Sequence, residues 1–375
     1  MIDRPHILFA GGGSLGHIYP GLSIAERLIR RAPQARITFV GDGRPIEKHT
    51  VRGAGFQYTS IPCGPKPRGL VQAARYAVSS VAGSCASVWL LGELKASLVI
   101  GLGGHASSAM LRGAMARRTP TVIVESNCQP TRSTRWLSRT ASACCLAYEQ
   151  TLPHLPVNAR AIITGAPGRP QFERGVRRRR SPDGKRVLVV IGGVGGSRTL
   201  NESIPESLQR LGGIPDGWRV VHQTGEGQLL ETERRYRERG IDALVVTYVD
   251  EMADLLSMAD LVVSPSGGCL LPELALAGAA GLIVPDTAAS EASQTMNAKL
   301  AAEAGGCRWV NEQDGNLSHL VATELRDLLA NDPLRDKMSQ RMSSWAQHGA
   351  ADRVASVCCD FLVGSAPVAA LSRAA

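Results

Sequence analysis

Two glycine-rich turns, half a chain apart, constrain the fold of this chain more than any other feature. The first turn is Gly-Gly-Gly-Ser-Leu-Gly-His at 11–17, behind the apolar run 7–10, and the second is Gly-Gly-Val-Gly-Gly-Ser at 192–197, behind the apolar run 187–191. Glycine lets the backbone turn sharply after a buried strand, and the N-terminus of a following helix favours an anion such as phosphate. The sequence therefore predicts two α/β halves whose facing strand ends form a cleft suited to a diphosphate-bearing substrate.

Short β-rich runs alternate with helical stretches in both halves, which is typical of a parallel sheet covered by helices on both faces. The runs are 36–40, 97–100 and 121–124 in the first half, and 219–222, 243–246, 261–263 and 281–284 in the second. We expect the domain boundary between Pro167 and Pro182. The first predicted strand follows residues 1–5 almost at once, which leaves no room for a signal peptide, so we expect a cytosolic protein.

The net charge of +9 indicates acidic partners: nucleic acid, anionic lipid or a phosphorylated substrate. An aromatic content of 4%, with no stretch that interleaves basic and stacking residues, argues against nucleic acid. The tract Arg177 to Arg180 precedes turn-forming residues, so we interpret it as a solvated loop rather than a binding patch. The nine cysteines contain no C-x-x-C and match neither a zinc site nor a disulfide framework.

Tyr76 to Gly92 carries no charge over seventeen residues. A membrane span needs about 20 mostly apolar residues, and this stretch contains several serines, so a spanning helix is disfavoured. Because Lys66, Arg68 and Arg75 precede it, the stretch is interpreted either as a core helix between two strands or as a helix that rests on anionic lipid.

The two glycine turns belong to a longer series of motifs that follow one another along the chain. The set comprises 11–20, 101–107, 125–127, 164–169, 192–201, 248–252, 266–273 and 294–298. These segments resemble the MurG family of bacterial glycosyltransferases, whose corresponding motifs include G-G-G-T-G-G-H-x-x-P, G-x-G-G-Y-x-S, E-Q-N and G-N-P-x-R. The resemblance covers about Ile7 to Ala351.

Several positions depart from the family pattern. Ser14 for threonine keeps a hydroxyl, and His105 for tyrosine keeps a polar ring. Other departures change the chemistry: these are Ser126, Val194, Pro265 and Ser293, together with residues 128–134, which lack the usual glycine and asparagine. The departures bear on substrate choice and rate, not on the fold.

The resemblance implies an α/β fold of the GT-B type, with two Rossmann-like domains whose parallel sheets face a central cleft. We expect residues 1–168 to form an acceptor and membrane-facing domain and residues 169–345 to form the UDP-sugar domain. Residues 346–375 would form a C-terminal helix and tail, and the helix is a candidate to return to the N-terminal domain.

The implied reaction transfers N-acetylglucosamine, with inversion, from UDP-N-acetylglucosamine to the muramoyl 4-hydroxyl of a polyprenyl-linked acceptor, undecaprenyl-pyrophosphoryl-N-acetylmuramoyl-pentapeptide (lipid I). The expected catalytic residues are His17, Asn127 and Glu125. Acceptor or membrane contacts are expected at His105, Arg68 and Arg75. The substrate-binding set comprises Ser14, Leu15, Gly16, Asn127, Arg169, Val194, Val249, Gly268, Cys269, Leu270, Leu271, Pro272, Glu273 and Gln294.

Each donor-side role implied by the family has a structural alternative. Glu273 would accept hydrogen bonds from the ribose hydroxyls; alternatively it is a solvated helix glutamate. Arg169 would stand near the diphosphate; alternatively it forms a surface ion pair. Val249 would meet uracil through its backbone, and Gln294 would face the sugar hydroxyls.

His17 is the first candidate for the base, because imidazole titrates near neutral pH and the residue ends the glycine turn. Alternatively, His17 only hydrogen-bonds backbone or substrate phosphate. Glu125 also has an alternative role, as a buried strand-end carboxylate that orders the next loop. With no D-x-D pair in the chain, we expect neither a metal nor another cofactor.

The expected partners are UDP-N-acetylglucosamine, lipid I, an anionic membrane surface and other cell-wall synthesis proteins, without nucleic acid. We expect a peripheral protein on the cytoplasmic face of the bacterial inner membrane. Three alternatives remain: a GT-B enzyme with another acceptor, a weakly catalytic nucleotide-binding relative, and a dinucleotide-dependent hydride-transfer enzyme. For the last, Asp42 stands at the end of the second strand, where such a fold needs an acid, but Glu273 and the paired second domain stay unexplained.

Overall fold

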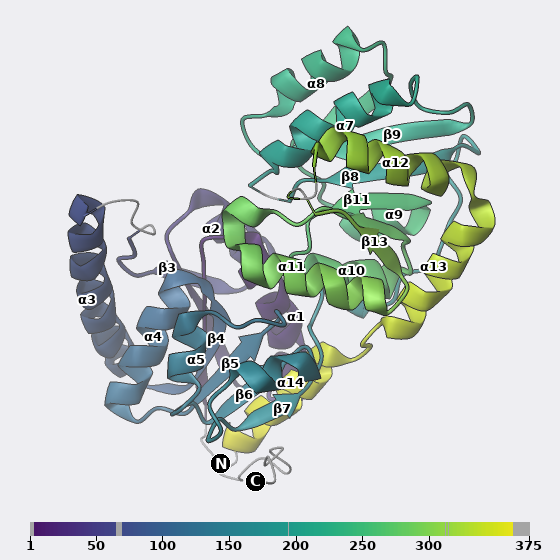
Figure 1. Cartoon of the computed structure of the whole chain (residues 1–375). Coiled ribbons are helices and arrows are strands. Elements are labelled where there is room, and N and C mark those ends of the chain that lie inside the picture. The colour runs from purple at the N-terminus through teal and green to yellow at the C-terminus, as the bar shows by residue number, and fades with distance from the viewer. Residues whose placement is uncertain (1–3, 65–69, 194, 312, 314, 363–375) are drawn as a thin grey trace. The chain divides into compact units, whose positions relative to one another are not determined.

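The computed structural model describes residues 4–64, 70–193, 195–311, 313 and 315–362, with the backbone alone for 70–77 and 287–291. The chain divides into two compact units, Met1–Pro170 with Gly349–Ala375, and Gln171–His348 (Figure 1). The division at Pro170 falls inside the segment where the sequence predicts a boundary.

The first unit is built on a seven-stranded parallel sheet with the order β3-β2-β1-β4-β5-β6-β7. Its strands are β1 (His6–Gly11), β2 (Arg36–Gly41), β3 (Gln57–Ser60), β4 (Ala96–Gly103), β5 (Thr121–Glu125), β6 (Ala143–Leu146) and β7 (Ala161–Ile163). Its helices are α1 (Leu15–Arg31), α2 (Pro45–Gly53), α3 (Leu70–Glu93), α4 (Gly104–Arg117), α5 (Arg132–Leu137), the 3₁₀ helix η1 (Glu149–His154) and α14 (Ala350–Leu362). The short α6 (Pro170–Glu173) lies at the boundary.

The second unit repeats this plan with a six-stranded parallel sheet in the order β10-β9-β8-β11-β12-β13. Its strands are β8 (Arg186–Ile191), β9 (Trp218–Gln223), β10 (Ala243–Val246), β11 (Leu261–Ser264), β12 (Gly281–Ile283) and β13 (Cys307–Trp309). Its helices are α7 (Arg198–Arg210), α8 (Leu229–Glu238), α9 (Met252–Met258), α10 (Leu270–Ala277), α11 (Thr287–Glu303), α12 (Leu317–Ala330) and α13 (Asp332–Trp345).

The strand that opens each unit is central in its sheet and almost entirely buried. All six residues of β1 are buried, and in β8 only Arg186 is exposed. Helices on both faces of a parallel sheet explain such unbroken apolar runs, as opposed to alternating ones. The predicted rhythm of strands and helices is therefore confirmed.

The last helix, α14, belongs with the first unit rather than with the second unit that precedes it in sequence. Arg27 of α1 forms an ion pair with Asp352 of α14, with Nε and Oδ2 2.9 Å apart. Arg353 Nε donates to the carbonyl of Thr164, 2.8 Å away. These contacts tie the end of the described chain to its beginning.

The uncharged stretch 76–92 lies in α3, and its described side chains divide between two faces. Gly83, Ser87 and Leu91 are buried. Val78, Val81 and Trp89 are 71%, 65% and 67% exposed. The interpretation as an ordinary core helix therefore holds for one face only. Among the described residues, no helix has the length and apolar character needed to cross a membrane.

The basic tract at 177–180 is exposed, and it also caps a helix. Arg178 donates to the carbonyls of Leu256 and Ala259 at the C-terminal end of α9, and Arg179 pairs with Asp254 at 2.9 Å. Cations suit this end of a helix, where carbonyls lack partners and the dipole is negative. The tract thus anchors a loop, in agreement with its interpretation as a loop rather than a binding patch.

Candidate active site

Each sheet has one point at which the strand order reverses, and the two glycine turns lie at these points. In the first unit β1 stands between β2 and β4, and in the second unit β8 stands between β9 and β11. Loops that leave neighbouring strands in opposite directions open a crevice at the carboxyl edge of the sheet, where ligands bind in folds of this type. The residues that follow β1 and β4, and β8 and β11, are therefore the first places to look for a site.

The turn after β1 ends in a capped helix that carries His17. Ser14 is the N-cap of α1 and accepts a hydrogen bond from Gly16 N at 3.1 Å. The Leu15 side chain is buried in the core, so only Ser14 and Gly16 of the three predicted turn contacts have exposed surface. Gly13 has a φ of +81°, a left-handed conformation that favours glycine.

His17 is held in the tautomer that a base requires. Its Nδ1 lies 2.8 Å from the carbonyl oxygen of Gly12. Because a carbonyl only accepts, Nδ1 carries the proton, and the Nε2 of the neutral ring keeps a lone pair. Burial lowers the pKa of His17, although its hydrogen bond to Gly12 and the carboxylates of Asp42 and Glu47 oppose that change. The ring is therefore neutral at physiological pH.

Glu47, on α2, holds the turn after β1 by hydrogen bonds, and the sequence did not predict this role. Its side chain is fully buried and accepts hydrogen bonds from Gly13 N at 2.8 Å, Asp42 N at 3.0 Å and the Tyr58 hydroxyl at 2.8 Å. The Gly13 N–H is thus already paired with an anion. The Asp42 carboxylate also lies against this turn, so a further negative charge would be repelled, and the turn is better suited to proton transfer than to diphosphate.

Two further predicted residues follow β4 and β5. His105 lies in the first turn of α4, and its charge contributes to the lowered pKa of His17. Glu125 ends β5 and is 6% exposed; its Oε1 accepts from Asn127 N at 3.1 Å and from Asn127 Nδ2 at 2.9 Å. Burial raises the pKa of Glu125, and the hydrogen bonds from Asn127 counteract that rise. These contacts fit the loop-ordering alternative for Glu125.

Arg169 lies in the first unit, although the sequence predicts that the UDP-sugar domain begins with it. Its guanidinium stands 4.5 Å from the ring centroid of Tyr19 on α1. This cation–π contact places the positive charge beside the first turn of the fold. Arg68 and the side chain of Arg75 lie outside the described residues.

The second glycine turn is supported by a neutral side chain. Gln223, at the end of β9, accepts from Gly193 N at 3.0 Å and donates to the carbonyls of Gly193 and Thr247, each 2.8 Å away. Gly196 has a φ of +74°, and a Cβ there would lie 2.2 Å from the Thr224 carbonyl oxygen. With no carboxylate in these contacts, this turn retains the anion preference of a helix N-terminus. Val194, one of the predicted contacts, lies outside the described residues.

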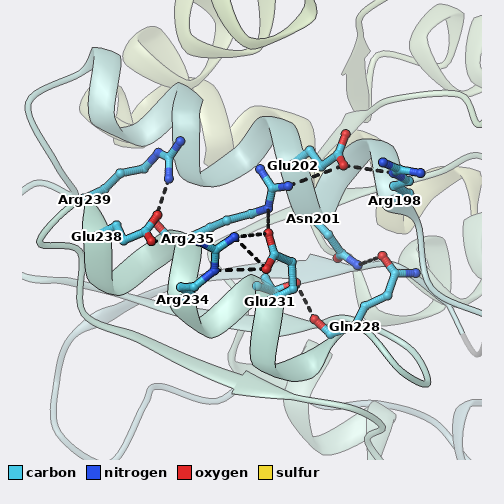
Figure 2. Close-up of polar contacts among 10 residues, drawn as sticks. Arg198, Asn201, Glu202, Gln228, Glu231, Arg234, Arg235, Glu238 and Arg239 are labelled. Atoms are coloured by element: carbon cyan, nitrogen blue, oxygen red, sulfur yellow. Dashed lines mark hydrogen bonds and ion pairs between the residues drawn. The ribbon is translucent and has the colours of Figure 1, made fainter.

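Asn201, which the family motif contains, belongs to a buried network behind the turn. Its amide nitrogen donates to Thr224 O at 3.1 Å and to Gln228 Oε1 at 2.8 Å (Figure 2), and its Oδ1 lies 2.9 Å from His222 Nε2. Burial lowers the pKa of His222 to about 3, so the ring is neutral, with its Nε2 proton donated to Asn201. Asn201 therefore ties α7 to the end of β9 and the loop after it, and Gly196 of the glycine turn packs against that loop.

An ion-pair cluster covers the surface above this network (Figure 2). It joins α7 to α8 through Arg198, Glu202, Glu231, Arg234 and Arg235. Exposed pairs of this kind contribute little to stability, about 0–1 kcal/mol each. Since their charges pair with one another, this surface does not supply a basic patch.

The loop after β11 is fixed to α11 through Gln294. Gln294 Oε1 accepts from Ser266 N at 2.8 Å, and Ser266 Oγ donates to the same oxygen at 2.7 Å. Asn297 Nδ2 donates to Ser266 O at 2.9 Å. Within the described part of the chain, the hydrogen bonds of the Gln294 side chain all engage Oε1.

Glu273 is buried in the first turns of α10, at 0% exposure. The alternative of a solvated helix glutamate is therefore wrong. Cys269 Sγ donates to Glu273 Oε1 at 3.4 Å. Of the remaining predicted contacts, Gly268, Cys269 and Leu270 are partly exposed, whereas Leu271 and Pro272 are buried.

Val249 lies in the loop between β10 and α9, packed partly against the core of the second unit. The same loop accepts two hydrogen bonds at Thr247 O, from Gln223 and from Gly225 N. The loops after β8, β9 and β10 are thus bonded to one another at one edge of the sheet. Among the described residues, no group of three or more His, Cys, Asp or Glu side chains is placed to hold a metal ion.

Comparison with known proteins defines the class. Residues 7–145 match the glycosyltransferase family 28 N-terminal domain, and residues 187–354 match the glycosyltransferase family 28 C-terminal domain. The two parallel sheets and these matches define a two-domain glycosyltransferase of the GT-B fold.

The curated relatives narrow the assignment. An enzyme of Syntrophotalea carbinolica named UDP-N-acetylglucosamine–N-acetylmuramyl-(pentapeptide) pyrophosphoryl-undecaprenol N-acetylglucosamine transferase is 34% identical over 94% of this chain and 98% of its own. An enzyme of Geobacter metallireducens with the same name is 32% identical over 88% and 91%. The chain therefore belongs to the family of these transferases, the MurG family.

Solved structures agree on the fold. MurG of Acinetobacter baumannii has a TM-score of 0.69 and 22% identity, covering 95% of this chain and 99% of its own. A UDP-GlcNAc 2-epimerase of Neisseria meningitidis reaches a TM-score of 0.67, with 13% identity over 95% of this chain and 100% of its own. Because enzymes of different reactions share this architecture, the fold alone does not identify the reaction.

Proposed function

We propose that this protein transfers N-acetylglucosamine, with inversion, from UDP-N-acetylglucosamine to the muramoyl 4-hydroxyl of lipid I, giving lipid II for peptidoglycan synthesis. The observation that carries the proposal is the identity to transferases of that name, along almost the whole chain. The two glycine turns support it through their different surroundings. Carboxylates flank the turn that bears the base, and neutral groups support the turn offered to a diphosphate.

The donor would bind to the second unit. The Glu273 carboxylate would accept hydrogen bonds from the ribose hydroxyls, and the Gln294 amide would donate to a sugar hydroxyl. The turn at 192–197 and the N-terminus of α7 would stabilise the negative charge that develops on the departing UDP. Val249 would meet uracil through its backbone, because an apolar side chain packed on the core leaves only peptide groups for recognition.

The acceptor would bind to the first unit, with His17 as the base. The neutral ring with its lone pair on Nε2 would take the proton of the 4-hydroxyl as the oxygen attacks the anomeric carbon. Asn127 and Glu125 would shape the acceptor loop, and His105 would lie beside the base. Arg169 would add positive charge near the diphosphate of the donor, UDP-N-acetylglucosamine.

The decisive experiment measures UDP release by purified protein from UDP-N-acetylglucosamine with a soluble lipid I analogue. We expect release that needs the acceptor, exceeds that with UDP-glucose or UDP-galactose, and persists in EDTA, because we propose that the reaction needs no metal. Loss of activity in EDTA that Mg²⁺ restores would contradict the last point alone. Binding of UDP with no turnover of any donor would contradict the proposed reaction.

We further propose that the protein works as a peripheral protein at the cytoplasmic face of the inner membrane, docking through α3. Val78, Val81, Cys85 and Trp89 are exposed and repeat at helical spacing on one face of α3. Exposed apolar surface of this kind marks an interaction site. Lys66, Arg68 and Arg75, which precede this face in sequence, would add about 1 kcal/mol each on an anionic surface.

Replacing Val78, Val81 and Trp89 together by serine is expected to weaken binding to phosphatidylglycerol vesicles by more than about tenfold, because each apolar side chain buried in lipid contributes about 1.5–3 kcal/mol. Vesicle sedimentation measures the change. Leu230→Ser, at a side chain 79% exposed in the second unit, is the matched control. Equal binding by the triple variant and the wild type would exclude α3 as the docking helix.

A further inference from the structure

Asp42 follows β2 at the position where a dinucleotide-binding fold places a ribose-binding acid, but its carboxylate is directed onto the glycine turn. Asp42 Oδ1 accepts a hydrogen bond from Ala106 N in the first turn of α4, at 3.2 Å. A Cβ at Gly12 would lie 2.7 Å from the same oxygen, and a Cβ at Gly13 would lie 3.3 Å from Oδ2. Both oxygens therefore lie against the turn after β1.

The same turn connects this carboxylate to His17. Gly12 O accepts the proton of His17 Nδ1, at 2.8 Å, while Gly12 itself touches Asp42. Gly104 packs on the other side, where a Cβ would lie 2.2 Å from Gly12 O. A Cβ at Gly103 would lie 2.9 Å from His17 Nε2. The turn after β1 and the junction of β4 with α4 thus meet around one imidazole, and Asp42 bonds the first turn of α4 while touching the turn after β1.

We propose that Asp42 is a positioning residue for the transfer reaction: it holds the first turn of α4 against the turn after β1 and sets a negative charge beside the His17 imidazole. The inference rests on the proposed role of His17 as the base. When the base takes the acceptor proton it becomes a cation at a partly buried site, and a fixed carboxylate nearby stabilises that cation.

Other charged groups also face the imidazole. These are Glu47 on α2 and His105 on α4. Two further titratable groups, Tyr58 and Cys63, lie against the carboxylates of Asp42 and Glu47, and Arg112 faces Cys63. Glu47 already accepts three hydrogen bonds, from Gly13 N, Asp42 N and Tyr58. Its charge is therefore largely balanced by donors, whereas Asp42 accepts from Ala106 N and from the Cys63 thiol. Asp42 is consequently the carboxylate whose removal should affect the imidazole most.

Two substitutions separate charge from structure. Asp42→Asn keeps an acceptor for Ala106 N and removes the charge, whereas Asp42→Ala removes both. In Asp42→Asn we expect the acidic limb of the kcat profile to move to lower pH and kcat at pH 7 to fall by about tenfold, less than the loss of a general base itself. We expect Asp42→Ala to show the same shift and a lower melting temperature. If Asp42→Asn keeps the wild-type profile while Asp42→Ala loses stability, the role is structural and the inference fails.

A second readout does not depend on turnover. The imidazole signals of the eight histidines can be titrated by NMR in the full-length protein, with His17→Gln to assign the His17 signal. The pKa of His17 should fall in Asp42→Asn and stay unchanged in Glu93→Gln, at an exposed position on α3. If Asp42→Asn does not fold, Asp42→Ser, also neutral and able to accept from Ala106 N, takes its place. A wild-type protein without transferase activity, but with this shift, would contradict the proposed function and leave the Asp42–His17 coupling established. An unchanged titration would overturn the coupling.

Discussion

Replacing Glu273 by alanine is expected to lower kcat/KM for UDP-N-acetylglucosamine by about 100-fold or more, mainly through weaker donor binding. The carboxylate lies beside Cys269 at the start of α10, where we propose that it meets the ribose hydroxyls. A hydrogen bond to a charged group contributes about 1.5–3 kcal/mol, and a ribose offers two hydroxyls. Steady-state kinetics and calorimetric titration with UDP measure the loss.

The controls separate recognition from folding. Glu273→Gln keeps the shape of the side chain without the charge, so it should fold as the wild type does and still bind UDP less tightly. Glu303→Ala removes an exposed carboxylate at the end of α11 and should change neither quantity. Unchanged UDP affinity in Glu273→Gln and Glu273→Ala would exclude Glu273 from the donor site.

Replacing His17 by glutamine is expected to lower kcat by about 10²–10⁴-fold, the usual contribution of a general base, with UDP affinity unchanged. The pH dependence follows from the lowered pKa of His17. A base works when deprotonated, so wild-type kcat should rise with pH through that pKa, below the ordinary histidine range, and be constant near neutral pH. The variant should lack this acidic limb.

His49 on α2 provides the matched control, because its side chain is exposed and lies in the same unit. His49→Gln should keep both the rate and the acidic limb. If His17→Gln loses less than tenfold in kcat, or keeps the limb, another group takes the proton. The alternative of a loop histidine that only bonds backbone or phosphate would then be favoured.

Much of the fold could be predicted from the sequence, because buried parallel strands are nearly continuous apolar runs. The runs at 187–191 and 121–124 correspond to β8 and β5. The missed strands β3, β7 and β13 lack this signal, whereas β6 (Ala143–Leu146) is a short buried apolar run that was also missed. Residues of β3, Gln57–Ser60, form a polar, partly exposed edge, and β7 and β13 have three residues each.

The motifs located the candidate site but not its internal supports. His17, Glu125 and Glu273 follow glycines or strand ends that mark the carboxyl edge of a parallel sheet. No such motif marks Glu47 or Gln223. Glu47 bonds a glycine 34 residues away in sequence, and Gln223 bonds a glycine 30 residues away. A single sequence does not encode which of many glutamates or glutamines meets a distant backbone N–H. Predicting them requires the positions of α2 and β9 in space.

The contact between α14 and α1 has a consequence for synthesis on the ribosome. The face of α1 that carries Arg27 acquires its partner Asp352 only after residues 171–348 have been made. Domains usually fold in the order of their synthesis, the N-terminal one first. Here the second unit is continuous in sequence, so it can fold as soon as it emerges, whereas the first must wait with one helix face uncovered. Truncation before residue 350 should therefore destabilise the part of the chain that is made first.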